Sequence, residues 1–177
     1  MAISHLSLVN QKLAFASSII TALSTYPDAT TAAQKIQRQA LGDAAVFHLS
    51  MGLHFYVREL AEHHQIKNVG SINSIQDLIS TLSEVDKASP ESFELVELAE
   101  LKGCWLNQLT HYYDQLSKSP EKSKEKKAFA QENLIAAVEL TEAESQLPVQ
   151  LTSELLGSWL ESFRVLVMRQ RETSTEY

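Results

Sequence analysis

The four prolines of this chain lie between, and never inside, the segments whose apolar residues recur every three or four positions. This spacing is the period of one face of an α-helix, and proline marks helix boundaries because it has no amide donor. No segment shows the strict alternation of a half-buried strand. The sequence therefore predicts an all-α protein, with helices near residues 4–24, 29–66, 74–86, 90–118 and 152–171.

A Ser-Pro-Glu motif occurs twice, at residues 89–91 and 119–121. Serine accepts hydrogen bonds from the free amides at a helix start, and proline suits the first helical position. Glutamate complements the positive end of the helix dipole. Each motif is therefore expected to begin a helix.

The second predicted helix is the longest, and its residues between 40 and 60 are apolar on nearly every side. A helix with this pattern is normally enclosed by other helices. We therefore expect a single domain over residues 1–177, a bundle of five or six helices around this central segment. The stripe predicted to be most buried is Ala33, Ala40, Phe47, His54 and Ala61.

Two further packing features follow from the same periodicity. Gly52, Gly103 and Gly157 lie inside helical patterns, where each glycine costs about 1 kcal/mol relative to alanine. We interpret them as places where helices approach closely. The helix at 90–118 is expected to bury Leu98, Leu101, Trp105, Leu109, Tyr112 and Leu116.

Residues 118–127 are rich in lysine and are expected to form a mobile loop. After them, residues 124–147 have the pattern either of a helix or of an extended crossover, and the sequence leaves both open. The tail at 172–177 is expected to fray.

Charge and cysteine content narrow the class of protein. A net charge of -7 repels polyphosphate, so nucleic acid is not an expected partner. The single cysteine, Cys104, cannot form an intrachain disulfide and favours a reducing, cytoplasmic location.

Residues 13–24 have the length of a signal-peptide core but lack the charged segment before it. No run of 18 apolar residues occurs, so no membrane association is expected.

Four of the six histidines lie between residues 45 and 64, which raises the question of a metal site. Two ligands on one helix must be three or four residues apart. His48 and His54 are six apart, and neither Glu-x-x-His nor His-Glu-x-x-His occurs there. Met51 lies three residues from each, a spacing that suits copper or haem iron, but it equally fits an ordinary core residue. We predict no metal and no cofactor.

His54 and Arg58 nevertheless stand out, because they lie one turn apart on or beside the stripe predicted to be buried. A buried imidazole or guanidinium needs polar partners. One interpretation is a satisfied core pair that fixes helix register. The other is a small-ligand site in the bundle, with His54, Arg58 and His48 as binding residues and Arg58 holding an anion.

No pair of a possible nucleophile and a possible base has the spacing that a catalytic site on one helix needs. Cys104 and His111 share a predicted helix face, but seven residues separate them by about 10.5 Å along the axis, too far for a hydrogen bond. Phosphate-binding glycine loops and Cys-x-x-Cys motifs do not occur either. We predict no catalytic residues and a protein that is not an enzyme.

Several segments occur in an order that suggests a family. They are NQKLAFA at 10–16, FHLSMGLHFYVRELA at 47–61, CWLNQL at 104–109, NLIAAV at 133–138 and an arginine-bearing last helix before the final Glu-Tyr. In these the chain resembles a gammaproteobacterial family of small proteins known as a domain of unknown function. The resemblance implies a bacterial, cytosolic, helical protein and supplies neither an activity nor site residues.

Two functions remain. The helices are amphipathic along their length, and no residues have catalytic spacing. These two features favour a non-enzymatic interaction or regulatory protein, which acts through a protein partner or self-association. The alternative is a small-ligand or metal-binding bundle that uses the polar residues of the second helix.

Overall fold

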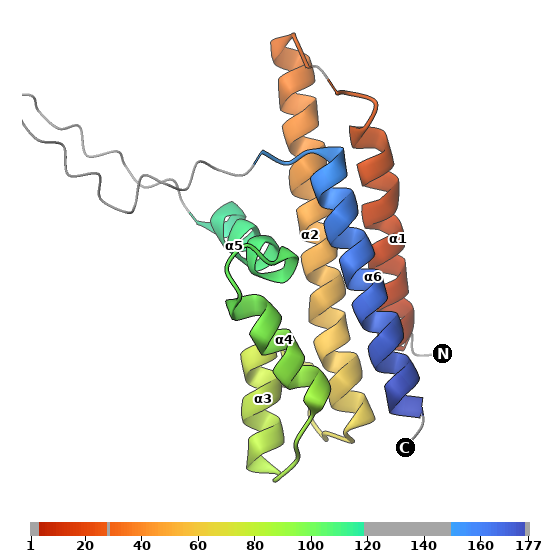
Figure 1. Ribbon diagram of the computed structural model, residues 1–177, viewed down its shortest axis with the longest axis vertical. Coiled ribbons are helices and arrows are strands. Elements are labelled where there is room, and N and C mark those ends of the chain that lie inside the picture. Colours follow the sequence, from red (N-terminus) through yellow and green to blue (C-terminus); the bar gives the residue numbers. More distant parts are fainter. Residues whose placement is uncertain (1–3, 28, 119–149, 176–177) are drawn as a thin grey trace, which may run out of the picture. The chain divides into compact units, whose positions relative to one another are not determined.

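The computed structural model describes residues 4–27, 29–118 and 150–175 (Figure 1). The predicted lysine-rich loop beyond residue 118 and the open choice at 124–147 lie outside these residues. Within them, α-helices and one short 3-10 helix make up the fold, which confirms the predicted all-α class. The elements are α1 (His5–Leu23), α2 (Ala32–His63), η1 (Val69–Ser71), α3 (Ile75–Glu84), α4 (Pro90–Glu100), α5 (Trp105–Ser117) and α6 (Ser153–Thr175).

Helix starts follow the predicted capping chemistry. Ser89 precedes α4, its side chain accepts a hydrogen bond from the amide of Ser92, and Pro90 is the first helical residue. This confirms the Ser-Pro-Glu prediction at 89–91, whereas its second copy lies outside the described residues. α2 begins with a reciprocal pair, in which Thr31 accepts from the Gln34 amide and the Gln34 side chain accepts from the Thr31 amide.

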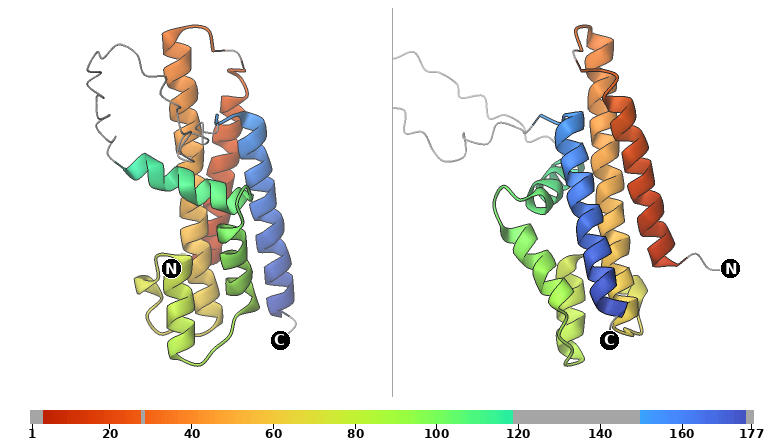
Figure 2. Two further views of the ribbon diagram at one scale, coloured as in Figure 1. Left: turned by 60° about the vertical axis from the view of Figure 1, so that its left-hand side comes forward. Right: turned by 45° about the vertical axis from the view of Figure 1, so that its right-hand side comes forward.

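Three long helices lie side by side, with α2 and α6 running in one direction and α1 in the other (Figures 1 and 2). Their largest fully buried side chains are Trp159, Tyr56 and Phe163. Burying side chains of this size contributes about 1.5–3 kcal/mol each. α5 lies across α2 and α6, while α3 and α4 pack beside the C-terminal half of α2.

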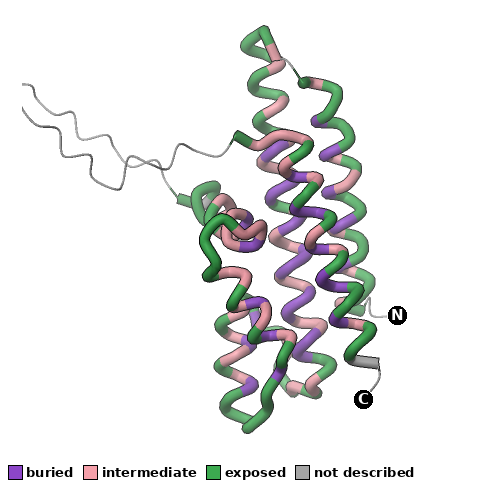
Figure 3. The backbone as a smooth tube through the Cα atoms, in the orientation of Figure 1, coloured by how far each residue is buried: buried purple, intermediate pink, exposed green. Residues whose placement is uncertain are grey.

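The predicted long second helix is confirmed, but the prediction of its most buried stripe is wrong. Phe47 is 44% exposed, Ala33 and Ala40 are exposed, and His54 is only half-buried. Of the predicted stripe, Ala61 alone is buried. The other side chains of this helix that face the core are Ala45, Val46, Leu49, Leu53, Tyr56, Val57 and Leu60. The helix carries apolar residues on more sides than its neighbours cover, so Ile36 and Phe47 are exposed to solvent. Figure 3 shows the buried, intermediate and exposed positions along α2.

The single helix predicted at 90–118 is also wrong, since α4 ends at Glu100 and α5 begins at Trp105. Between them Gly103 has φ +82°, a left-handed conformation that a continuous helix does not contain. The break exposes Leu101, which is 62% accessible, and Leu116 is also exposed, against the prediction that both are buried. The change of direction lets α5 cross α2, which opens space between α2, α3, α4 and α5.

α6 continues to Thr175, beyond the predicted helix end at residue 171. Arg171 explains why the helix is still held here. Its guanidinium makes two hydrogen bonds to Glu59, of 2.7 and 2.8 Å, and a third of 3.1 Å to the side chain of Asn10. These contacts fasten the end of α6 to both α1 and α2.

Among the described residues, α1 alone is long and apolar enough to cross a membrane by length and composition. Core helices of soluble proteins and signal sequences meet the same measure. α1 also packs along α2, and its Val9, Leu13 and Ala16 are buried. The predicted absence of membrane association stays a prediction.

Candidate functional site

His54 and Arg58 both hold the segment that connects η1 to α3. The Arg58 guanidinium donates to the carbonyl oxygens of Ile72, at 2.9 Å, and Gly70, at 3.1 Å, and to Asn73 Oδ1 at 3.0 Å. His54 Nδ1 lies 3.2 Å from the carbonyl oxygen of Asn73. Because a carbonyl can only accept, Nδ1 carries the proton in this contact. The structure thus brings these two predicted residues together on one loop.

The same loop is fastened to the start of α3. The amide of Asn73 donates to Asp77 Oδ2 at 3.0 Å, and its side-chain amide donates to the Ser71 carbonyl at 3.0 Å. Ser74 caps α3 by accepting from the Asp77 amide at 3.1 Å. Residues 70–77 are therefore held by hydrogen bonds at both ends, and residues 73–76 of this segment form one wall of a pocket.

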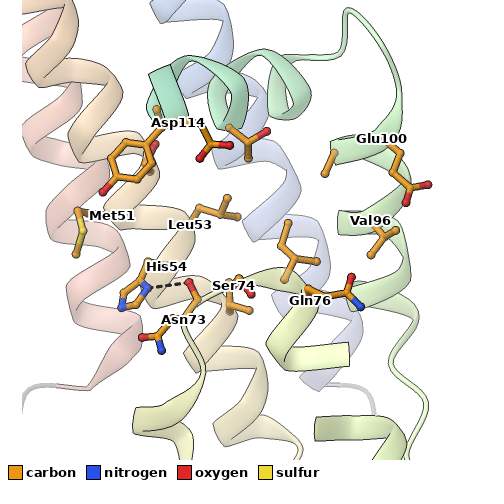
Figure 4. Close-up of a pocket in the computed structure, with 15 residues that line it drawn as sticks. Met51, Leu53, His54, Asn73, Ser74, Gln76, Val96, Glu100 and Asp114 are labelled. Atoms are coloured by element: carbon orange, nitrogen blue, oxygen red, sulfur yellow. Dashed lines mark hydrogen bonds between the residues drawn. The ribbon is translucent and has the colours of Figure 1, made fainter. Parts of the chain in front are cut away.

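A pocket of about 530 Å³ lies against this wall (Figure 4). Its lining comes from α2, the loop before α3, and the helices α3, α4 and α5. Apolar side chains make up much of it, with hydroxyl, amide and carboxylate groups among them. The lining residues are Ser50, Met51, Leu53, His54, Val57, Asn73, Ser74, Ile75, Gln76, Val96, Ala99, Glu100, Thr110, Tyr113 and Asp114.

The electrostatics of the pocket are set by its carboxylates. Of the described residues that line it, Glu100 and Asp114 are acidic and none is lysine or arginine. Burial lowers the pKa of His54, and the charges of Arg58 and His5 lower it further, against the opposing effect of its hydrogen bond to Asn73. His54 is therefore neutral at neutral pH and leaves the lining with net negative charge.

His48, the third predicted ligand residue, lies apart from the other two. Its ring contacts those of Phe15 and Phe47 edge-on, each with a centroid distance of 5.4 Å. Its Nδ1 is buried and has no hydrogen-bond partner among the described residues. Burial, followed by the charge of Lys12, lowers the pKa of His48. His48 belongs to the contact between α1 and α2, whereas Met51 and His54 line the pocket.

Within the part of the chain that the structure describes, no group of three or more His, Cys, Asp or Glu residues could hold a metal ion. Cys104 and His111 do not form a pair either. Cys104 lies in the turn before α5, and His111 Nε2 is 2.9 Å from the side-chain nitrogen of Gln115.

Sequence reasoning missed most of the pocket. Asn73 precedes α3, Val96 lies on α4, and Thr110 and Asp114 lie on α5, the helix that begins after the break at Gly103 and contacts α2 and α4. One signal was available, since an Asn-Ser pair just before an apolar periodic run indicates a capped helix start. The glycine within the predicted fourth helix was a second signal, because it also fits a break.

The fold and the site define an all-α helical-bundle protein with an open, largely apolar pocket that one polar loop borders. The chain belongs to DUF6586, a family of unknown function whose profile matches residues 1–177. No curated protein and no solved structure matches the chain.

Proposed function

We propose that the protein is a non-enzymatic binding protein that holds a small, largely apolar molecule in the pocket between α2, α3, α4 and α5. The observation that carries this proposal is the pocket of about 530 Å³. Its size lies within the range of about 300–1,000 Å³ typical of ligand sites, which combine apolar walls with a few placed polar groups.

The hydrogen bonds that hold residues 70–77 support the proposal, because a site that is already formed loses little conformational freedom when a ligand binds. Arg58 and His54 hold the loop from α2, while Asp77 holds it from α3. Arg58 acts in this proposal as a positioning residue. An anionic ligand at its guanidinium would have to displace three contacts to the chain's own oxygens.

A pocket-filling substitution tests the proposal. Val96 is half-buried and lines the pocket, so Val96→Phe places a ring in the space available to a ligand. Val165→Phe is the matched control, because Val165 is 55% exposed on α6. Binding of a neutral naphthyl dye, followed by fluorescence, is expected to be lost in V96F and kept in V165F. Equal dye binding by V96F and the parent protein would refute the proposed site.

A second candidate function is protein interaction or self-association through the uncovered face of α1 and α2. Phe15 and Phe47 are 43% and 44% exposed and lie on either side of His48. Aromatic side chains exposed together are typical of interaction surfaces. Native mass spectrometry of the parent protein and of Phe15→Ser with Phe47→Ser tests it, since an assembly held by this face is expected to dissociate in the double variant. A parent protein that is monomeric and captures no partner would remove this candidate.

A further inference from the structure

We propose that the ligand of this pocket is a neutral molecule with an apolar body and an acceptor oxygen, such as a ketone or ester carbonyl, to which the Ser50 hydroxyl donates. This inference rests on the proposed binding function and names the chemical class of the ligand. Its basis is a buried hydroxyl in the pocket lining that the described part of the protein leaves without a hydrogen bond.

Ser50 lies inside α2 and lines the pocket. The residue as a whole is half-buried, but its Oγ is buried and has no hydrogen-bond partner among the described residues. A hydroxyl inside a helix can donate to a carbonyl three or four residues earlier, as Thr110 does at 3.1 and 3.0 Å. Buried polar groups without a partner are rare, because each one costs free energy. The hydroxyl of Ser50 is therefore available to a molecule in the pocket.

Other polar groups of the lining are already bound to the chain. Thr110 donates to its own helix, and Ser74 accepts from an amide in the first turn of α3 at 3.1 Å. The side chain of Asn73 is held on both of its polar atoms, by Arg58 and by the carbonyl of Ser71. Ser50 differs from these groups because its hydrogen bond is still to be made.

The surroundings of Ser50 favour a neutral ligand. Met51, Leu53 and Val57 bring apolar side chains from the same helix, and Ile75 and Val96 bring them from α3 and α4 (Figure 4). No lysine or arginine occurs among the described lining residues, so a carboxylate in the pocket would have no counter-charge there. A neutral acceptor oxygen satisfies the hydroxyl and buries no charge.

The size of the effect follows from a single hydrogen bond. Serine turns its hydroxyl among three staggered positions about one bond, so Oγ meets a bound ligand without a change in the backbone. A hydrogen bond between neutral groups contributes about 2- to 12-fold in affinity. The apolar walls supply the rest of the binding free energy.

Two ligands of nearly the same shape test this inference: 2-acetylnaphthalene, a ketone, and 2-isopropenylnaphthalene, in which a CH2 group replaces the carbonyl oxygen. Their dissociation constants are measured by displacement of the naphthyl dye. In Ser50→Ala the ketone is expected to weaken by about 2- to 12-fold relative to the alkene, whose own affinity stays unchanged. Ser80→Ala is the matched control, because Ser80 is exposed on α3 outside the lining, and it should keep the ratio of the parent protein.

A second measurement uses the protein without any ligand. Both variants replace serine by alanine inside a helix and gain the same helix propensity, but only S50A also removes a buried hydroxyl that has no partner. S50A is therefore expected to melt about 2–4 °C above S80A. A melting temperature no higher than that of S80A would show that the hydroxyl is bound within the protein, which overturns the inference.

The outcomes separate this inference from the function on which it rests. If neither naphthyl ligand binds, the proposed binding function fails. If both bind and S50A leaves their affinity ratio unchanged, the binding function stands, but the hydroxyl is bound by water or by the chain and the ligand class is wrong. Equal loss of the ketone and the alkene in S50A would also overturn the assignment, because it would show a change of shape rather than the loss of one hydrogen bond.

Discussion

The hydroxyl of Tyr56 on α2 donates a hydrogen bond of 2.6 Å to Oε1 of Gln170 on α6, in the interior of the bundle. Tyr56 is 1% exposed and Gln170 3%. Burial raises the pKa of Tyr56, which keeps the hydroxyl protonated and able to donate. The Gln170 side-chain nitrogen donates in turn to Glu94 at 2.8 Å, so one amide joins three helices.

Removing this donor is expected to destabilise the protein. Tyr56→Phe keeps the ring but removes the hydroxyl that donates to the buried Gln170 oxygen, and loss of this buried hydrogen bond is expected to lower the free energy of unfolding by about 1–3 kcal/mol. Urea denaturation measures the change. Tyr26→Phe is the control, because the Tyr26 hydroxyl makes no hydrogen bond in the described part of the chain, and it should change stability little. Equal stability of Y56F and Y26F would contradict the assigned bond.

Two helix glycines are expected to respond to alanine in opposite ways. A Cβ on Gly52 would lie 3.2 Å from Cε1 of Phe163, and that ring is confined by Trp105, with which it stacks at 5.5 Å. A Cβ on Gly157 would have no atom within 4 Å. Gly157→Ala is therefore expected to stabilise by up to about 1 kcal/mol, the gain in helix propensity. In Gly52→Ala the same gain in helix propensity is offset by overpacking against Phe163, which costs about 1–3 kcal/mol, so this variant is expected to be less stable than the parent protein.

Thermal unfolding of the two alanine variants and of Gly52→Leu checks this expectation. The order of melting temperature should be G157A, parent protein, G52A and then G52L. A G52A variant as stable as G157A would show that α2 and α6 are not in close contact at this position.

Arg58 is expected to act on the local order of the pocket wall as well as on overall stability. Arg58→Met removes the donors to Ile72, Gly70 and Asn73, and should raise amide hydrogen exchange across residues 69–74. Hydrogen bonds from a charged donor contribute about 1.5–3 kcal/mol, so stability should fall by a similar amount. Arg164→Met on α6 is the control and should leave exchange in that loop unchanged.

Stability is expected to fall in mild acid because of three histidines. Burial is the largest cause that lowers the pKa of His48, His54 and His64 below 6.5; for His64 it outweighs the attraction of Glu91. As the pH falls through 6.5, the unfolded chain binds protons that the folded protein does not, so the free energy of unfolding decreases. Urea titrations between about pH 7.5 and 5.5 measure the slope.

The matched variants for this pH dependence are His54→Gln, His64→Gln and His111→Gln. The first two are expected to flatten the slope, while H111Q, at an exposed position, is expected to keep it. An unchanged slope in a variant that lacks both His54 and His64 would contradict the assignment.

The helical class and most helix positions followed from local chemistry, because apolar spacing and capping residues act within a few positions along the chain. The 3-4 spacing of Leu156, Trp159, Leu160 and Phe163 predicts a buried face, and all four are buried. The exposed face of α2 was not predictable in this way. Periodicity shows which residues can be buried, whereas the number of neighbours that cover them depends on the tertiary arrangement.

The candidate site was predictable only in part. The spacing of His54 and Arg58 correctly indicated two polar residues that need partners, but apart from the side chain of Asn73 those partners are backbone carbonyls of the loop at 70–73. Backbone acceptors carry no sequence signal. The pairing of Glu59 with Arg171 was hidden for another reason, since more than a hundred residues separate the two along the chain.

Gly103 is the position at which this architecture is most directly testable, because its φ of +82° separates α4 from α5. An alanine held in the left-handed backbone conformation costs about 1–2 kcal/mol, and asparagine adopts this conformation more readily. Gly103→Ala is therefore expected to lower the free energy of unfolding by that amount and G103N by less, as measured in urea. Gly70→Ala is the control, since a Cβ there would have no atom within 4 Å and no positive φ opposes it. If G103A were as stable as the parent protein, the left-handed turn would be contradicted, and with it the break that lets α5 cross α2 and line the pocket.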